Sequence, residues 1–153
     1  RVTHNDTKLN NVLLDERTGR ALCVIDLDTV MPGFTAYDYG DAVRFAANTA
    51  AEDEPDTSKV SLDLRLCRAF TDGFVGKIRD RLRPEEVNTL PDGLLLITLE
   101  LAARFLTDYL DGDRYFKIRT GGHNLVRACN QIALAQDICR KMDDLREIVA
   151  QQA

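Results

Sequence analysis

The spacing of hydrophobic and polar residues differs between the first third of the chain and the rest. Near the start, two short apolar runs, residues 12–14 and 21–25, flank the polar segment 15–20. Two short runs around a polar segment predict a β-hairpin, in which Gly19 can take a positive φ near the turn. The Met-Pro-Gly segment at 31–33 is typical of a loop.

Beyond residue 37 the apolar positions recur at helical spacing. Residues 94–110 are apolar around most of a helix circumference, which predicts a central, buried helix. Residues 124–149 carry one apolar stripe, so a single long helix is expected there. Further helices are predicted at 38–48, with Asp38 or Asp41 at the N-terminus, and at 62–82. The expected fold class is α+β, mostly α, with a helical body and one small β-hairpin.

Length and composition are those of a globular protein. The 153 residues suffice for one domain with a core; 44% are apolar and 29% are charged. A formal charge of −5 gives no electrostatic reason to expect nucleic acid or an anionic membrane as a partner. The longest apolar run is too short to span a bilayer. No signal peptide is visible, and a start at Arg1 suggests a piece of a longer protein.

Four cysteines stand at positions 23, 67, 129 and 139, and none forms a C-x-x-C pair. No Cys/His cluster has the spacing of a zinc site. We therefore expect four reduced, mostly buried thiols in a cytoplasmic protein.

A polar stretch, HNDTKLNN, lies directly before the apolar run 12–14; residues 4–11 are called the polar loop below. It contains His4, Asp6 and Asn11 in the pattern H-x-D-x-x-x-x-N, which is the spacing of a kinase catalytic loop. In that chemistry an aspartate orients the attacking hydroxyl and accepts its proton, while an asparagine oxygen reaches Mg²⁺. Because the pattern fixes only three residues, it is a weak signal by itself.

The residues downstream strengthen this interpretation. The apolar segment VIDLD contains Asp26, fifteen residues after Asn11, and ends at Asp28. A strand ending in aspartate, one hairpin after such a loop, is where a kinase-like enzyme keeps its main magnesium carboxylate. The next acidic cluster, YDYGD, supplies Asp38 and Asp41, which are expected to brace the loop or to cap the following helix. His4 is expected to support the loop through hydrogen bonds.

The stretches HNDTKLNNVLLD, VIDLDTVMPG and AYDYGDAVR resemble the phosphotransferase family that includes aminoglycoside phosphotransferases and choline kinases. With ITLELAARFLTDYLDGDRYFKIR and GGHNLVRACNQIAL they look, more narrowly, like N-acetylhexosamine 1-kinases. The resemblance covers residues 4–135. It implies that residues 1–153 form the C-terminal lobe of a two-lobed, protein-kinase-like fold. The N-terminal nucleotide lobe, the natural intramolecular partner, is absent from the sequence.

The resemblance also implies the use of ATP and Mg²⁺ and assigns roles to residues. Asp6 is expected to be the catalytic base or to orient the acceptor hydroxyl, and Asn11 and Asp26 to be magnesium ligands. Lys8 either neutralises charge on the transferring phosphoryl group or is a solvated lysine. Asp28 either holds a second metal ion, binds a sugar hydroxyl or caps the following turn.

Arg104 interrupts the most apolar predicted helix, and a buried guanidinium needs a partner. Glu100, one turn earlier, is one candidate for an ion pair. The resemblance implies another role, in which Arg104 and Tyr115 contact the sugar through fixed donors, a ring face and a hydroxyl. Asp108 and the acidic loop, residues 51–58, are expected to be solvated. For the acidic run at 52–56 a functional role is the alternative, since it stands beside the expected cleft.

Together these observations predict an enzyme that transfers the γ-phosphoryl group of ATP to the anomeric hydroxyl of an N-acetylhexosamine. Positioning and charge neutralisation carry such a reaction. Without a nucleotide lobe, the chain by itself is expected to be inactive. Two alternatives remain open: a kinase for another small alcohol, such as an amino alcohol or aminoglycoside, and a non-catalytic binding module that keeps the fold.

Overall fold

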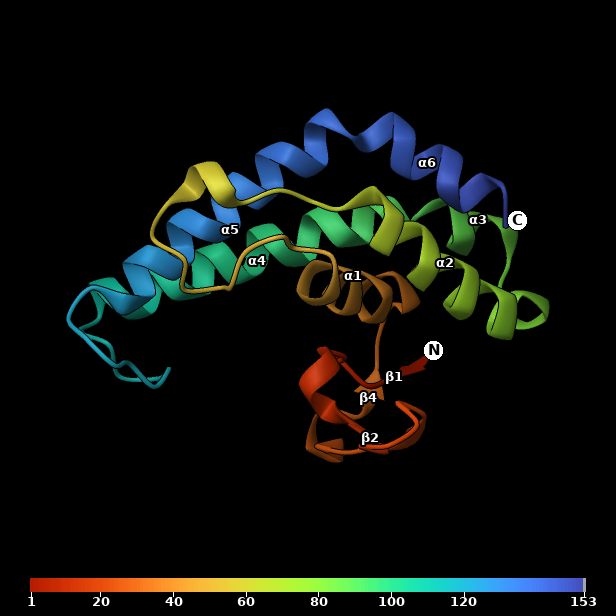
Figure 1. Ribbon diagram of the computed structural model, residues 1–153, viewed down its shortest axis with the longest axis horizontal. Coiled ribbons are helices and arrows are strands. Elements are labelled where there is room, and N and C mark those ends of the chain that lie inside the picture. The colour runs from red at the N-terminus through yellow and green to blue at the C-terminus, as the bar shows by residue number, and fades with distance from the viewer. Residues whose placement is uncertain (153) are drawn as a thin grey trace.

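The computed structural model describes residues 1–152, which form a small strand-and-loop region beside a body of helices (Figure 1). The strands are β1 (Val2–Thr3), β2 (Val12–Leu14), β3 (Ala21–Val24) and β4 (Met31–Pro32). The α-helices are α1 (Thr35–Ala46), α2 (Leu64–Ile78), α3 (Pro84–Asn88), α4 (Leu90–Leu110), α5 (His123–Arg140) and α6 (Met142–Ala150). Short 3₁₀ helices are η1 (Leu9–Asn11), η2 (Leu27–Thr29), η3 (Thr57–Lys59) and η4 (Arg79–Arg81). The predicted class, α+β and mostly helical, agrees with this arrangement.

Two small antiparallel sheets form the strand-and-loop region: β2 pairs with β3, and β1 pairs with β4. The turn between β2 and β3 is closed by Asp15, whose carbonyl accepts from the Gly19 N–H and whose carboxylate accepts from the Thr18 N–H. Gly19 has a φ of +65°, a conformation that glycine adopts without steric cost. The predicted hairpin is confirmed, whereas the expected loop at 31–33 begins as strand β4.

The prediction that Asp38 or Asp41 starts the first helix is wrong, because both residues lie inside α1. Phe34 precedes the helix and provides no side-chain cap. The Asp38 carboxylate binds the backbone of the polar loop instead.

The predicted helix at 62–82 begins at Leu64 and ends earlier, at Ile78, followed by η4. The carboxylate of Asp63 accepts from the backbone N–H groups of Arg65 and Leu66 and so caps the start of α2.

The predicted helix at 124–149 is divided into α5 and α6. Lys141, between them, has φ −101° and ψ 11°, outside the helical region. Its ammonium group donates to the Leu62 carbonyl and to the Asp137 carboxylate. The break therefore follows a tertiary contact that the periodicity of the stripe does not reveal.

The core lies among the six α-helices, and α4 runs between α1 and α5 (Figure 1). The Tyr39 hydroxyl hydrogen-bonds to Thr71 at 2.8 Å inside this core, and burial raises the pKa of Tyr39 to about 12. The largest fully buried apolar side chains are Tyr39, Leu62, Leu90, Leu94, Leu134, Ile138 and Leu145.

α1 and α4 approach each other at two glycines. A Cβ on Gly40 would lie 2.7 Å from the carbonyl carbon and oxygen of Gly93. A Cβ on Gly93 would lie 2.3 Å from the carbonyl oxygen of Ala36. Backbone atoms cannot yield as a flexible side chain can, so the helix separation depends on the missing side chains at both positions.

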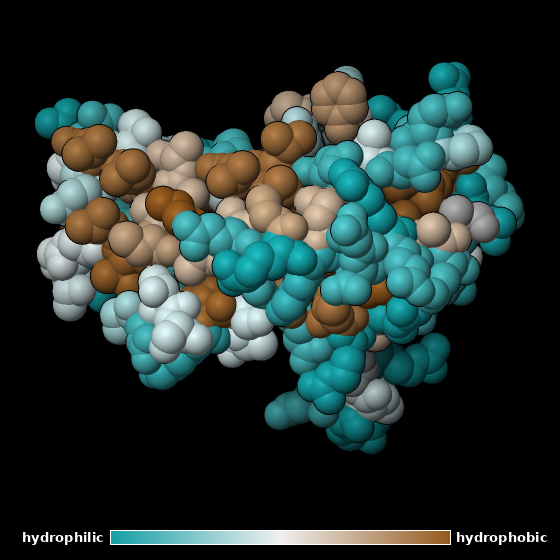
Figure 2. Space-filling model, turned by 90° about the horizontal axis from the view of Figure 1, so that it is seen from above, coloured by the Kyte–Doolittle hydropathy of each residue, from teal (hydrophilic) through white to brown (hydrophobic). Residues whose placement is uncertain are grey.

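α4 is central, as expected, but the expectation that it is buried is wrong for part of its surface. One side packs in the core, but Leu96 and Leu110 are 52% and 73% exposed. Figure 2 shows hydrophobic side chains gathered toward one end of the face seen from above. The apolar composition of residues 94–110 therefore does not reveal which sides of α4 pack against other helices and which are exposed.

The expected burial of the thiols is also wrong for three of the four. Cys67 is buried, while Cys23, Cys129 and Cys139 are exposed. Within residues 1–152, no helix has the length and apolarity needed to cross a membrane.

Candidate active site

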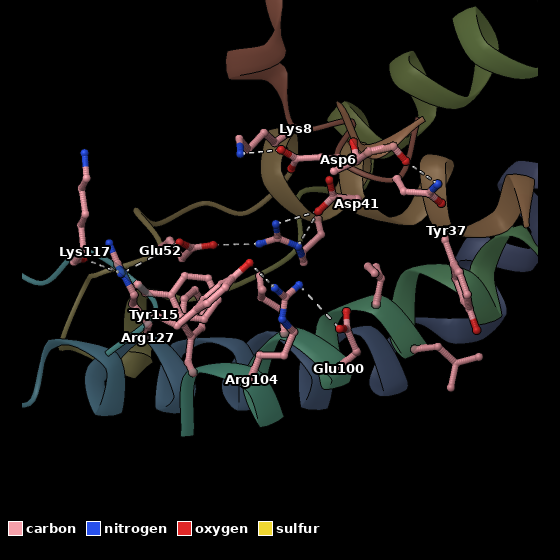
Figure 3. Close-up of a pocket in the computed structure, with 18 residues that line it drawn as sticks. Asp6, Lys8, Tyr37, Asp41, Glu52, Glu100, Arg104, Tyr115, Lys117 and Arg127 are labelled. Carbon is pink, nitrogen blue, oxygen red and sulfur yellow. Dashed lines mark hydrogen bonds and ion pairs between the residues drawn. The ribbon is translucent and has the colours of Figure 1, made fainter. Parts of the chain in front are cut away.

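A cavity of about 780 Å³ separates the polar loop from α4 and the segment after it (Figure 3). Asp6 and Lys8 line one side in this view, and Arg104 and Tyr115 line the other. The structure thus brings four of the seven predicted site residues to one cavity. Asn11, Asp26 and Asp28 do not line it; their positions are described below.

The polar loop is held by one carboxylate of α1. Asp38 accepts hydrogen bonds from the His4 N–H and from the Asn5 N–H, each at 2.8 Å. The Thr7 hydroxyl donates to the Asp38 carbonyl. Hydrogen bonds to an ionised acceptor are stronger than neutral ones. The expectation that Asp38 braces the loop is confirmed.

Two residues at or beside the predicted site residues have a left-handed backbone conformation. Asn5, directly before Asp6, and Asp26 itself both have a φ of 64°. Such backbone geometry is unfavourable for a non-glycine residue and persists where surrounding contacts enforce it. Asn5 has such contacts, since its amide donates to the Thr29 carbonyl at 3.0 Å and its Oδ1 accepts from the Thr3 hydroxyl at 2.9 Å.

The Asp6 carboxylate has partners on one oxygen. Its Oδ2 accepts from Lys8 Nζ at 2.8 Å and from Asn11 Nδ2 at 2.9 Å. Asn11 is buried, and its amide also donates to the Asp6 carbonyl at 2.9 Å. No residue among 1–152 donates a hydrogen bond to Asp6 Oδ1. That oxygen can therefore accept a proton or a hydrogen bond from a molecule in the cavity.

Asp26 is linked to the polar loop through its neighbour. The Ile25 N–H donates to the Asn11 carbonyl at 2.9 Å, and the Ile25 carbonyl lies 3.0 Å from His4 Nε2. His4 therefore has the structural contacts expected of it. Asp26 and Asp28 are both exposed, and Asp28 lies in the first turn of η2, where no contact of its carboxylate distinguishes its three possible roles.

The oxygen donors suit a magnesium ion. The amide nitrogen of Asn11 is fully engaged with Asp6, while its Oδ1 accepts no hydrogen bond from the described residues. The Asp26 carboxylate is likewise free of protein partners among residues 1–152. Mg²⁺ in phosphoryl-transfer sites takes one or two protein carboxylates or carbonyls and completes its shell with phosphate and water. In the same part of the chain no group of three or more His, Cys, Asp and Glu side chains forms a metal site by itself.

The prediction that Arg104 is buried is wrong, since its side chain is 46% exposed. Its guanidinium lies 3.7 Å from Glu100 and donates to the Tyr115 hydroxyl at 3.4 Å. It also lies 5.6 Å from the ring centre of Tyr115 and 5.5 Å from that of Phe116. Glu100, the ion-pair partner considered from the sequence, is therefore present, and Arg104 faces the cavity beside Tyr115.

The position of Tyr115 is set by Asp108, which is buried rather than solvated. The carboxylate accepts from the backbone N–H groups of Arg114, Tyr115 and Phe116 at 2.8–2.9 Å. Burial alone would raise the pKa of Asp108, but these three backbone donors bring it below its ordinary value. One buried carboxylate thus fixes the wall that faces the polar loop.

A charge network in the cavity escaped the sequence interpretation. The Arg44 guanidinium is 5% exposed and binds Asp41 at 2.8 Å and Glu52 at 3.0 Å. It also donates to Gln131 at 3.3 Å. The i, i+3 spacing of Asp41 and Arg44 on one helix was the available signal. The link to Glu52 crosses between segments, so local spacing does not predict it.

Residues 52–54 of the acidic loop are docked rather than solvated, whereas residues 55–58 are exposed as expected. Besides the pair between Glu52 and Arg44, Asp53 lies 3.3 Å from the buried His123 ring and 3.5 Å from Arg119. Asn130 donates to the Ala51 carbonyl at 2.9 Å. These contacts attach the loop to α5 and turn Glu52 toward the cavity.

Comparison with known proteins adds one finding. Residues 1–74 match a model of the phosphotransferase enzyme family. The match supports a kinase-like phosphotransferase. It includes the polar loop, the hairpin, Asp26 and the Asp38 brace, which are the parts that the geometry connects. Arg104 and Tyr115 lie beyond the matched residues.

Proposed function

We propose that the chain is the acceptor-binding, catalytic-loop part of an ATP-dependent kinase that phosphorylates the anomeric hydroxyl of an N-acetylhexosamine. In this proposal a nucleotide-binding lobe precedes Arg1 in a longer protein. The observation that supports it best is the free Oδ1 of Asp6 at a cavity whose other side presents Arg104 and Tyr115.

The proposed reaction forms one P–O bond and breaks another. The anomeric hydroxyl oxygen attacks the γ-phosphorus of ATP, and the bond between that phosphorus and the β,γ-bridging oxygen breaks, releasing ADP. Asp6 orients the hydroxyl and receives its proton. Asn11 and Asp26 would hold Mg²⁺, which when bound neutralises charge on the phosphate oxygens. Lys8, beside Asp6, adds a positive charge at the same place.

The acceptor side suits a neutral sugar. A guanidinium offers several fixed donors to hydroxyl and amide oxygens, and the Tyr115 ring offers a face for C–H groups. Cationic and anionic side chains are nearly balanced around the cavity, five against four. A polycationic aminoglycoside would meet Arg104, Lys117 and Arg127 there, which disfavours that alternative.

The alternative of a non-catalytic binding module requires that the catalytic side chains have lost their arrangement. Asp6, Lys8 and Asn11 are instead joined by hydrogen bonds at 2.8–2.9 Å, with one Asp6 oxygen left free. This arrangement favours an active parent enzyme.

The test uses the full-length protein with ATP, Mg²⁺ and a panel of N-acetylhexosamines, amino alcohols and aminoglycosides. ADP release and the phosphorylated product are measured for the wild type, for Asp6→Asn and for Asp80→Asn, an exposed control. We expect turnover only with N-acetylhexosamines, a fall of about 10²–10⁴-fold for Asp6→Asn and no change for the control.

Turnover only with another alcohol would keep the kinase and reject the sugar. No turnover with any acceptor would favour the binding module. The 153-residue chain by itself is expected to show no measurable turnover, and a rate near that of the full-length protein would reject the need for a nucleotide lobe.

A further inference from the structure

Glu52 reaches the cavity from the acidic loop, a segment that the proposed reaction has not yet used. In Figure 3 its carboxylate lies on the same side of the gap as Asp41, with Tyr115 and Arg127 nearby. Its side chain is 31% exposed, so a molecule in the cavity can contact it.

Arg44 fixes the position of Glu52. The guanidinium of Arg44 is almost completely buried and holds one Glu52 oxygen, Oε1, at 3.0 Å. The same guanidinium holds Asp41 Oδ1 at 2.8 Å. Both carboxylates are therefore immobilised by one cation, whose single positive charge offsets one of their two negative charges.

Both carboxylates have a second oxygen without a hydrogen bond, but only that of Glu52 belongs to a side chain with substantial exposure. Glu52 Oε2 has no hydrogen bond from the described residues, and Arg127 Nε lies 4.0 Å from it. Asp41 is 8% exposed, and its Oδ2 is buried without a partner. The unsatisfied Glu52 oxygen at the wall of the cavity calls for a donor, and neutral hydroxyl groups supply donors without adding charge.

We propose that Glu52 accepts a hydrogen bond from a ring hydroxyl of the sugar acceptor, and that Arg44 is the residue that positions it. The inference rests on the proposed function and deepens it. It places a second carboxylate, besides Asp6, on the sugar. Because a site built to bind a hydroxyl rejects the analogue that lacks it, Glu52 contributes to the choice among hexosamines.

The test compares acceptor kinetics of the full-length wild type with Glu52→Gln, Glu52→Ala and Arg44→Lys. Glu54→Gln is the matched control: it lies in the same loop, but its carboxylate binds Lys59 and does not line the cavity. Each protein is assayed with an N-acetylhexosamine and with its monodeoxy analogues. Melting temperatures confirm folding, and Glu52→Gln preserves the side-chain shape if Glu52→Ala unfolds.

We expect Glu52→Gln and Glu52→Ala to raise the acceptor KM by about 10- to 100-fold, as for the loss of a hydrogen bond to a charged group. The KM for ATP stays unchanged. The analogue that lacks the hydroxyl bound by Glu52 has a raised KM with the wild type. Its KM does not rise further in the Glu52 variants. Arg44→Lys gives a smaller change of the same pattern, because the cation is kept while its fork geometry is lost.

Two results separate this inference from the proposed function. If the wild type phosphorylates the sugar but every deoxy penalty is the same in the Glu52 variants and in the control, Glu52 does not bind the acceptor. If the wild type phosphorylates no N-acetylhexosamine, the proposed function fails and the inference fails with it.

Discussion

The strand-and-loop region, residues 1–34, and the helical body are held together in different ways. The first has two short sheets, and many of its large apolar side chains, such as Leu22 and Leu27, are exposed. Its polar loop takes its shape from hydrogen bonds to Asp38. The body packs apolar side chains of six helices into one core. The comparison shows that the predicted chemistry lies where polar contacts set the geometry, on a scaffold that apolar packing makes stable.

The largest expected effect tests the scaffold. Gly40→Ala would place a Cβ 2.7 Å from the backbone of Gly93. We expect it to lower the free energy of unfolding by about 3 kcal/mol, because neither helix can move without disturbing the core. The melting temperature would fall by about 10 °C.

Gly76→Ala on α2 is the control, since no atom lies within 4 Å of its added Cβ. It should stabilise by about 0.7 kcal/mol through helix propensity alone. Equal effects of the two substitutions would show that the close approach of α1 and α4 does not matter for stability.

The second effect should be local. Asp38→Asn keeps the shape but weakens the hydrogen bonds to the backbone of His4 and Asn5, which we expect to cost about 2 kcal/mol in the opening of the polar loop. Amide hydrogen exchange at residues 4–11 should accelerate roughly 30-fold, while exchange in the core stays slow.

Asp92→Asn, at an exposed position of α4, serves as the control and should leave exchange unchanged. A global loss of protection with Asp38→Asn would mean that the two regions unfold as one unit, against the comparison drawn above.

The third expected effect is a pH dependence of the stability of the helical body, through Asp137 on α5. Burial opposes ionisation of Asp137, but hydrogen bonds from Lys141, the Leu62 N–H and Ser61 bring its pKa to about 2. An unfolded aspartate titrates near pH 3.9, so the stabilisation is complete above about pH 4 and is lost as the pH falls toward 2.

Asp137→Asn should therefore lower the free energy of unfolding by roughly 1–2 kcal/mol at pH 7 and by progressively less in acid. Urea unfolding at pH 7, 4 and 3 measures this, with the fully exposed Asp143→Asn as control. A difference between wild type and Asp137→Asn that does not shrink with falling pH would contradict the assignment.

The smallest effect involves no change in stability. Burial raises the pKa of the Cys67 thiol to about 12, whereas the other three thiols are exposed. A maleimide reagent should label three cysteines of the native chain and four in denaturant, as counted by mass spectrometry. Peptide mapping that found Cys67 labelled as fast as Cys23 would show that the core opens readily.

The sequence was sufficient for features that depend on local spacing. The pattern of His4, Asp6 and Asn11, the hairpin around Gly19 and the bracing role of Asp38 all follow from residues close in the chain or from their order along it. Arg44 illustrates what could not be predicted, because it joins Glu52 of a loop to Gln131, which lies 87 positions away. The break at Lys141 and the burial of Asp108 likewise depend on tertiary contacts that no periodicity shows.

The glycine contact between α1 and α4 has a mechanical consequence. Asp38 on α1 carries the polar loop, and α4 carries Glu100 and Arg104 on the other side of the cavity. Since the two backbones touch at Gly40 and Gly93, the polar loop and the Arg104 side of the cavity belong to one stiff frame. The distance between the two sides of the cavity is therefore set by the packing of α1 against α4, before any ligand binds. If the proposed function holds, an acceptor is selected by the width that it fills, because the contact at Gly40 and Gly93 leaves no hinge between α1 and α4.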